Sequence, residues 1–201
     1  MAQRTRRLRQ ELTNIPNLLT YGRIAVIPLL LSLVAHDSPA NCMWAAVLYS
    51  VAGITDVLDG FLARLSNQVS MIGKFLDPLA DKLYVLLLMV ALVPLGRMPV
   101  WVVGVALTRE LAVTGLRAIA AGEGLIISAS DSAKMKTTFQ LIGNVGLLLH
   151  YRYTLGILGR PIDFDFHNIG MVFVYISLLL SVVSGVRYFM GFLAAIEKQE
   201  S

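Results

Sequence analysis

Four aspartates within 26 residues are the side chains of this sequence best suited to chemistry. Asp56 and Asp59 are three residues apart, and Asp77 and Asp81 are four residues apart. If both segments are helical, each pair lies on one face of its helix, with Cβ atoms ~5–6 Å apart. Two such pairs on facing helices would form a binuclear metal site.

The sequence around these aspartates is strongly apolar, which makes their charge costly. Each Asp at the middle of a membrane helix opposes insertion by roughly 2.5–3.5 kcal/mol, so four uncompensated carboxylates approach ~10 kcal/mol. Bound divalent ions would remove most of that cost. The alternative is that the four carboxylates are exposed caps at helix ends.

The composition is that of a membrane protein. Of the 201 residues, 56% are apolar and 15% are charged, and the mean hydropathy is +0.69. This composition is too hydrophobic for an ordinary soluble domain of this length. The single cysteine, Cys42, excludes an intrachain disulfide and most cysteine-based metal sites, so we interpret it as a small packed hydrophobic residue.

The hydrophobic pattern predicts an all-α integral membrane protein. Apolar runs of about 20 residues, each long enough to cross a hydrocarbon core, are separated by polar or Pro/Gly breaks. We expect the extracytoplasmic segment 155–168 to be a simple connector. The six predicted transmembrane helices lie near residues 17–36, 42–62, 77–95, 99–119, 134–154 and 169–193.

Basic residues predict the orientation. An even number of spans places both termini on one side, and fourteen of the 17 Lys and Arg residues fall on or toward that side. The other three are Arg97, Arg152 and Arg160. By the positive-inside rule both termini and the aspartates of this multi-pass protein are predicted to be cytoplasmic. We expect the membrane to be the bacterial inner membrane.

Residues 1–15 form a separate basic segment ahead of a single six-helix domain over 16–201. Arginines at positions 4, 6, 7 and 9 interleave with apolar residues at helical spacing. This pattern predicts a short amphipathic helix in the headgroup layer, attracted to an anionic lipid bilayer. A solvated basic tail is the alternative. A secretory signal peptide is rejected, because no small-residue cleavage site follows the apolar run.

The aspartates belong to a longer pattern that resembles a known family. With no departure at any fixed position, it matches the signature of the CDP-alcohol phosphatidyltransferases, integral membrane enzymes of phospholipid synthesis. The resemblance extends from about Asn14 to Gln140. The matching pattern is Asp56-x2-Asp59-Gly60-x2-Ala63-Arg64-x8-Gly73-x3-Asp77-x3-Asp81.

The resemblance implies roles for each signature residue. Two Mg²⁺ or Mn²⁺ ions would be ligated by Asp56, Asp59 and Asp77. Asp81 would contact one ion and act as the general base. The CDP moiety would be fitted by Gly60, Ala63, Arg64 and Gly73.

Physical chemistry is consistent with these roles. Two hard cations held by oxygen ligands can bridge a diphosphate and stabilise the leaving phosphate. Asp81 could accept the proton of an attacking hydroxyl. Arg64 offers a planar fork for phosphate oxygens, with a topology signal as its alternative. The two glycines allow close backbone approach to the nucleotide, or else helix packing.

The residues before the signature suggest further contacts. The segment from Asn14 to Arg23 is similar to the one that starts the first span in family members using sn-glycerol 3-phosphate, where Asn17 and Thr20 would lie near the nucleotide. Arg23, inside a span, must find a carboxylate or a phosphate. Ser70 is a weaker candidate for a CDP contact, with a loop or capping role as its alternative.

A second basic group is predicted to bind the acceptor phosphate. It consists of Arg109, Arg117, Lys134 and Lys136, in runs that look like those of the same family members. Their convergence would form an anion pocket. For Arg109 the alternative is an internal pair with Glu110 or an Asp, and for the lysines it is a topology signal alone.

The expected reaction transfers a phosphatidyl group from CDP-diacylglycerol to sn-glycerol 3-phosphate. One alternative keeps the chemistry with inositol phosphate, serine or phosphatidylglycerol as acceptor. A remote alternative is a divalent-cation transporter, which should distribute carboxylates across the membrane depth.

Expected partners include a second copy of the chain but no nucleic acid. The small-residue ridge Ser177, Ser181 and Gly185 could serve a homodimer or pack within one subunit. No chemistry is assigned to His36, His150 or His167.

Overall fold

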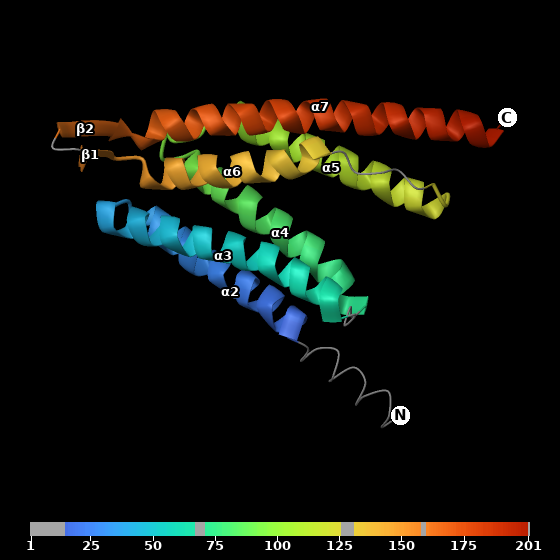
Figure 1. Cartoon of the computed structure of the whole chain (residues 1–201), viewed down its shortest axis with the longest axis horizontal. Coiled ribbons are helices and arrows are strands. Elements are labelled where there is room, and N and C mark those ends of the chain that lie inside the picture. The colour runs from blue at the N-terminus through green and yellow to red at the C-terminus, as the bar shows by residue number, and fades with distance from the viewer. Residues whose placement is uncertain (1–14, 67–70, 126–130, 158–159, 201) are drawn as a thin grey trace, which may run out of the picture. The chain divides into compact units, whose positions relative to one another are not determined.

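The computed structural model describes residues 15–66, 71–125, 131–157 and 160–200. The helix predicted over residues 1–15 therefore lies almost wholly outside the described residues, as does Ser70. The described helices are α2 (Ile15–Ala35), α3 (Pro39–Ser66), α4 (Met71–Leu92), α5 (Val100–Gly122), α6 (Asp131–Leu149) and α7 (Phe166–Glu200) (Figure 1).

These six helices follow the six predicted apolar segments in order. By length and composition, one helix of the described chain, over Phe166–Lys198, is long and apolar enough to cross a membrane. The stretches Thr20–Ala35 and Lys82–Leu92 are apolar but shorter. The structure is thus mostly helical, as predicted, and the six membrane spans stay a prediction.

The prediction of an all-α chain is wrong between α6 and α7. The helix predicted over 134–154 ends at Leu149, and the predicted connector contains an antiparallel hairpin of β1 (Arg152–Ile157) and β2 (Arg160–Asp165). β-Branched and aromatic residues such as Tyr153 and Phe164, which face each other in the register, favour extended backbone.

Asp165 ends the hairpin and caps α7. Its carboxylate accepts the Asn168 backbone N–H at 3.1 Å and pairs with Arg152 at 3.4 Å. The Asn168 N–H, assisted by the charge of Arg152, holds the pKa of the Asp165 carboxyl below its usual range. The cap explains why α7 begins three residues before the predicted span.

The chain divides into two compact units, residues 1–94 and 95–201. In the first, α2 packs against both α3 and α4. Tyr84 of α4 donates a hydrogen bond of 2.7 Å to the Tyr49 carbonyl of α3, and the two rings stack with centroids 4.8 Å apart. These buried contacts position the helices that carry the aspartates.

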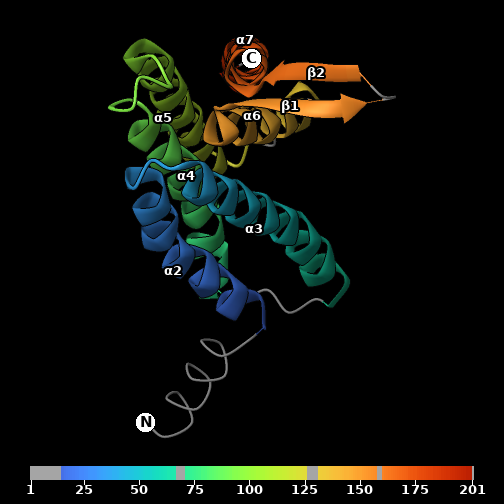
Figure 2. The same ribbon diagram turned by 90° about the vertical axis from the view of Figure 1, so that its left-hand side faces the viewer.

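In the second unit, α7 packs against α6 and α5. Figure 2 views α7 along its axis, with the hairpin beside its first residues. The ridge of α7 faces into this unit, because Ser177 and Ser181 are buried and a Cβ at Gly185 would lie 3.4 Å from Arg109 Cγ. Of the two roles considered for the ridge, packing within the subunit is the one observed.

Glycines allow the backbones of α6 and α7 to touch. A Cβ at Gly170 would lie 2.8 Å from the Gly143 carbonyl oxygen, and a Cβ at Gly146 would lie 2.7 Å from Gly170 Cα. Contacts this close cannot be relieved by a side-chain movement, since the obstructing atoms are backbone. The α6–α7 pair therefore depends on these three positions.

We expect Gly170→Ala to destabilise the protein by about 1–3 kcal/mol, because the added methyl forces the two backbones apart. The measurement is the thermal unfolding midpoint in detergent. Gly104→Ala on α5 is the matched control, since a Cβ there meets nothing within 4 Å. Equal midpoints for the two variants would contradict this account of the α6–α7 contact.

Candidate active site

The four signature aspartates lie on two consecutive helices. Asp56 and Asp59 are in the C-terminal half of α3, and Asp77 and Asp81 are in the N-terminal half of α4. The helical spacing predicted for each pair is therefore confirmed, so each pair shares a helix face. Their side chains are outside the described set, and their convergence stays a prediction.

Chain connectivity limits the distance between the end of α3 and the start of α4. Five peptide steps lead from Ser66, the last residue of α3, to Met71, the first of α4. That length of chain spans at most ~18 Å even when fully extended. The signature glycine and arginine positions, Gly60, Arg64 and Gly73, lie on the same two helix segments.

The donor set suits hard divalent cations. Carboxylate oxygens are the ligands preferred by Mg²⁺ and Mn²⁺, and the signature contains neither His nor Cys. Among side chains whose positions are described, no group of three or more His, Cys, Asp or Glu is arranged for a metal. The chemistry of the signature thus fits divalent ions.

Two predicted site residues of α2 are buried in the first unit. Thr20 and Arg23, one turn apart, are 4% and 7% exposed. Arg23 lies within electrostatic range of the Tyr84 hydroxyl on α4, and Tyr84 is three residues beyond Asp81. Asn17 is also on α2, but its side chain is outside the described set.

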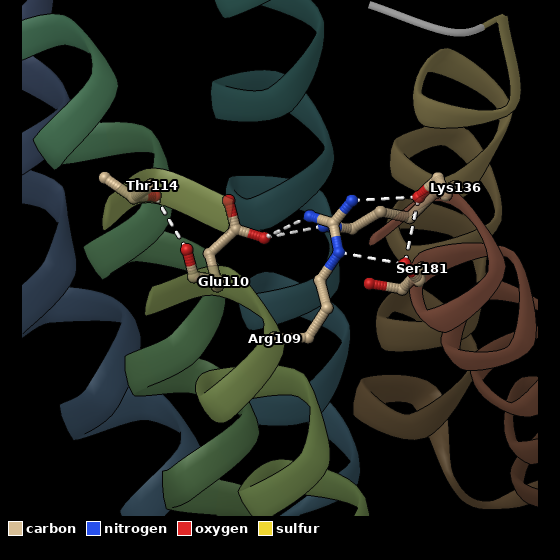
Figure 3. Close-up of polar contacts among 6 residues, drawn as sticks. Arg109, Glu110, Thr114, Lys136 and Ser181 are labelled. Carbon is tan, nitrogen blue, oxygen red and sulfur yellow. Dashed lines mark hydrogen bonds and ion pairs between the residues drawn. The ribbon is translucent and has the colours of Figure 1, made fainter. Parts of the chain in front are cut away.

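In the second unit, Arg109 of α5 is tied to α7 and to its own neighbour (Figure 3). Its Nε donates to the Ser181 carbonyl oxygen at 2.9 Å, and its Nη2 donates to Ser184 Oγ at 2.8 Å. Its Nη1 donates to Glu110 Oε2 at 3.0 Å. The internal pair with Glu110, considered as the alternative for Arg109, is thus present.

Glu110 holds a second cation. The same Oε2 atom accepts a hydrogen bond of 2.7 Å from Lys136 Nζ on α6. The three side chains are 13–20% exposed, so the ion pairs are largely shielded from solvent. We call Arg109, Glu110 and Lys136 the ionic cluster. It connects α5 to α6 through Glu110 and to α7 through Arg109.

Of the other two predicted acceptor residues, Arg117 lies apart from these contacts, and the Lys134 side chain is outside the described set. Arg117 stands over the Tyr188 ring of α7 at 5.8 Å, and its position is ~12 Å further along α5 than Arg109. Lys134 is on α6. Sequence reasoning missed Ser184, whose only signal was its place one turn after Ser181.

Comparison with known proteins decides the family. The model of the CDP-alcohol phosphatidyltransferase family matches residues 13–183. The chain belongs to the CDP-alcohol phosphatidyltransferase family. Members of this family are membrane enzymes that depend on divalent metal, and the resemblance inferred from the aspartate signature is confirmed.

Individual relatives align over most of their length. A Bacillus subtilis protein named CDP-diacylglycerol--glycerol-3-phosphate 3-phosphatidyltransferase is 37% identical over 188 residues, covering 88% of this chain and 93% of the relative. A Rickettsia bellii protein of the same name is 35% identical over 176 residues, with the same coverage. One from Wigglesworthia glossinidia brevipalpis is 29% identical, again with 88% and 93% covered.

For the ionic cluster of this phosphatidyltransferase, we expect Glu110→Ala to lower stability by roughly 1–3 kcal/mol. The substitution leaves two shielded cations without their shared carboxylate. Glu110→Gln should cost less, because the amide oxygen still accepts a hydrogen bond. The readout is the thermal unfolding midpoint in detergent, with the exposed Glu123→Ala as control. If Glu110→Ala were as stable as the control, the cluster would have no structural role.

Proposed function

We propose that this protein transfers the phosphatidyl group of CDP-diacylglycerol to sn-glycerol 3-phosphate, giving phosphatidylglycerophosphate and CMP. It would thus be a phosphatidylglycerophosphate synthase acting in phosphatidylglycerol and cardiolipin synthesis. The observation that carries the proposal is near full-length similarity to enzymes named for this reaction, in a chain with the complete signature on two consecutive helices.

The aspartates supply the metal-binding part of the proposal. Asp56, Asp59 and Asp77 would hold two Mg²⁺ or Mn²⁺ ions, with Asp81 contacting one of them. When bound, such ions neutralise the diphosphate of CDP-diacylglycerol and stabilise the departing phosphate. The oxygen-only donor set supports this assignment.

Asp81 would act as the general base. The acceptor hydroxyl gives its proton to the Asp81 carboxylate while its oxygen bonds to the phosphorus that carries diacylglycerol. The bond from that phosphorus to the CMP oxygen breaks, and its electron pair leaves with CMP. No covalent enzyme intermediate is required, because the acceptor attacks the lipid phosphate directly.

The remaining signature residues would bind CDP. Arg64 can donate a two-pronged set of hydrogen bonds to phosphate oxygens. The small residues Gly60, Ala63 and Gly73 would leave room for the nucleotide against the helices. Further contacts would come from Asn17, Thr20 and Ser70, and Arg23 would offer charge beside α4.

The ionic cluster would bind the acceptor phosphate. Arg109 has five N–H donors, and its three observed hydrogen bonds use only some of them. Glu110 holds Arg109 and Lys136 together, and the cluster keeps a net positive charge. A phosphate could therefore meet two cations already positioned, with Arg117 and Lys134 adding charge along the same helices. An uncharged acceptor would make no use of this arrangement.

The proposed setting is the bacterial inner membrane. Helices of 19 to 35 residues support six spans, and the basic residues support cytoplasmic termini and a cytoplasmic active site. We also propose one six-helix domain over 16–201, a membrane-surface helix over 1–15 and a homodimer. The exposed apolar side chains along α7 support contact with lipid or a second copy.

The direct test is CMP release by purified protein in detergent with CDP-diacylglycerol, Mg²⁺ and a panel of acceptors. We expect release with glycerol 3-phosphate and none with inositol phosphate, serine or phosphatidylglycerol. Release with another acceptor, and not with glycerol 3-phosphate, would overturn the proposed acceptor while keeping the family chemistry.

A lysine variant makes this assay specific for the acceptor site. Lys136→Met should raise the KM for glycerol 3-phosphate at least ~10-fold, because a charge-assisted hydrogen bond is worth ~1.5–3 kcal/mol. The KM for CDP-diacylglycerol should not change. Lys198→Met, at an exposed position near the end of α7, is the control.

Asp81→Asn should lower kcat at least ~100-fold, because the amide cannot accept the acceptor proton. Binding of cytidine nucleotide should be largely preserved, since the other three aspartates remain. The measurements are CMP release and nucleotide titration on the same preparation, with the exposed Asp37→Asn as control. Normal turnover in Asp81→Asn would remove Asp81 from the mechanism.

A further inference from the structure

Two histidines that the proposed reaction does not use meet at the hairpin end of the second unit. His150 directly follows α6, and His167 is in the first turn of α7. Their Nδ1 atoms are 3.2 Å apart, and their rings are nearly perpendicular, with centroids 5.0 Å apart. Both side chains are partly exposed, so the pair is accessible from outside the helix packing.

His150, directly after the last residue of α6, has a left-handed backbone conformation. Its φ is +46°, which makes it the one non-glycine residue with positive φ in the described part of the chain. An L residue in this left-handed region costs roughly 1–2 kcal/mol. This conformation ends α6, and the chain turns there so that His150 lies beside the first turn of α7.

The distance between the two nitrogens matches that in a tetrahedral metal site. Zinc–nitrogen bonds of ~2.0–2.1 Å at tetrahedral angles place two ligand nitrogens ~3.3 Å apart. A collinear N–H···N hydrogen bond would separate the two ring centroids more than the observed 5.0 Å. The rings therefore meet at an angle, as they do when both direct a lone pair at one ion.

The surroundings also favour a cation. The Asp165 carboxylate is two residues from His167 and is held in place by the Asn168 backbone N–H. Arg152 pairs with the same carboxylate and balances part of its charge. We propose that His150 and His167 form a binding site for Zn²⁺, with water completing the coordination, which would link the end of α6 to the start of α7.

This proposal is independent of the phosphatidyl transfer reaction. The signature aspartates are oxygen donors suited to Mg²⁺, whereas imidazole nitrogens suit Zn²⁺ and Cu²⁺. The competing explanation is a simple hydrogen bond between two neutral imidazoles, which would bind no metal. A direct measurement of metal binding distinguishes the two explanations.

The test uses full-length protein without a histidine tag, in detergent with excess Mg²⁺ to occupy the aspartates. Zn²⁺ is titrated in competition with a colorimetric chelator. We expect one Zn²⁺ per chain, and His150→Ala and His167→Ala should each weaken binding by at least the ~10-fold that loss of an outer-shell partner costs. His36→Ala is the matched control, since His36 is exposed and its Nδ1 lies 2.8 Å from the Ser32 carbonyl oxygen. Unchanged Zn²⁺ affinity in both variants would overturn the proposal.

A second measurement needs no variant and covers the case in which a substitution prevents folding. Cu²⁺ bound to the wild-type protein should show an electron paramagnetic resonance spectrum with hyperfine splitting from two imidazole nitrogens. A spectrum with oxygen ligands alone would show that the histidine pair does not bind the ion and would overturn the proposal.

Discussion

Charge placed among apolar helices must be compensated, and the chemistry-bearing parts of this protein depend on that requirement. In the second unit one carboxylate, Glu110, compensates two cations on different helices. The aspartates of α3 and α4 carry negative charge that also needs compensation, and we assign that compensation to divalent cations. The two assignments place a cation-binding group on one unit and an anion-binding group on the other.

Close helix packing places the partners of the ionic cluster. Gly143, Gly146 and Gly170 let α6 and α7 approach to backbone contact, which small residues permit within apolar bundles. The adjoining part of α7 supplies Ser181 and Ser184, whose oxygens accept hydrogen bonds from Arg109. Arg109, which is predicted to bind substrate, is thus held by α7, and the position of α7 depends on its glycine contacts with α6.

Most of the helical architecture was predictable because hydrophobic runs of membrane length have few alternatives to a helix. The family was predictable because eight fixed positions carry the signature. The hairpin was not, since residues 152–165 are a short mixed segment whose strands form only by pairing with each other. The early end of α6 was missed for a related reason, because the left-handed turn at His150 has no glycine to signal it.

For this protein, the sequence alone determined the order of the described helices, the signature and the family, because these follow from local periodicity and from the identity of residues at set spacings. Only the tertiary structure decided that Glu110 joins Arg109 to Lys136 and that His150 meets His167. Glu110 and Lys136 are 26 residues apart, and His150 and His167 are 17 residues apart, so their distances depend on packing that no local pattern specifies.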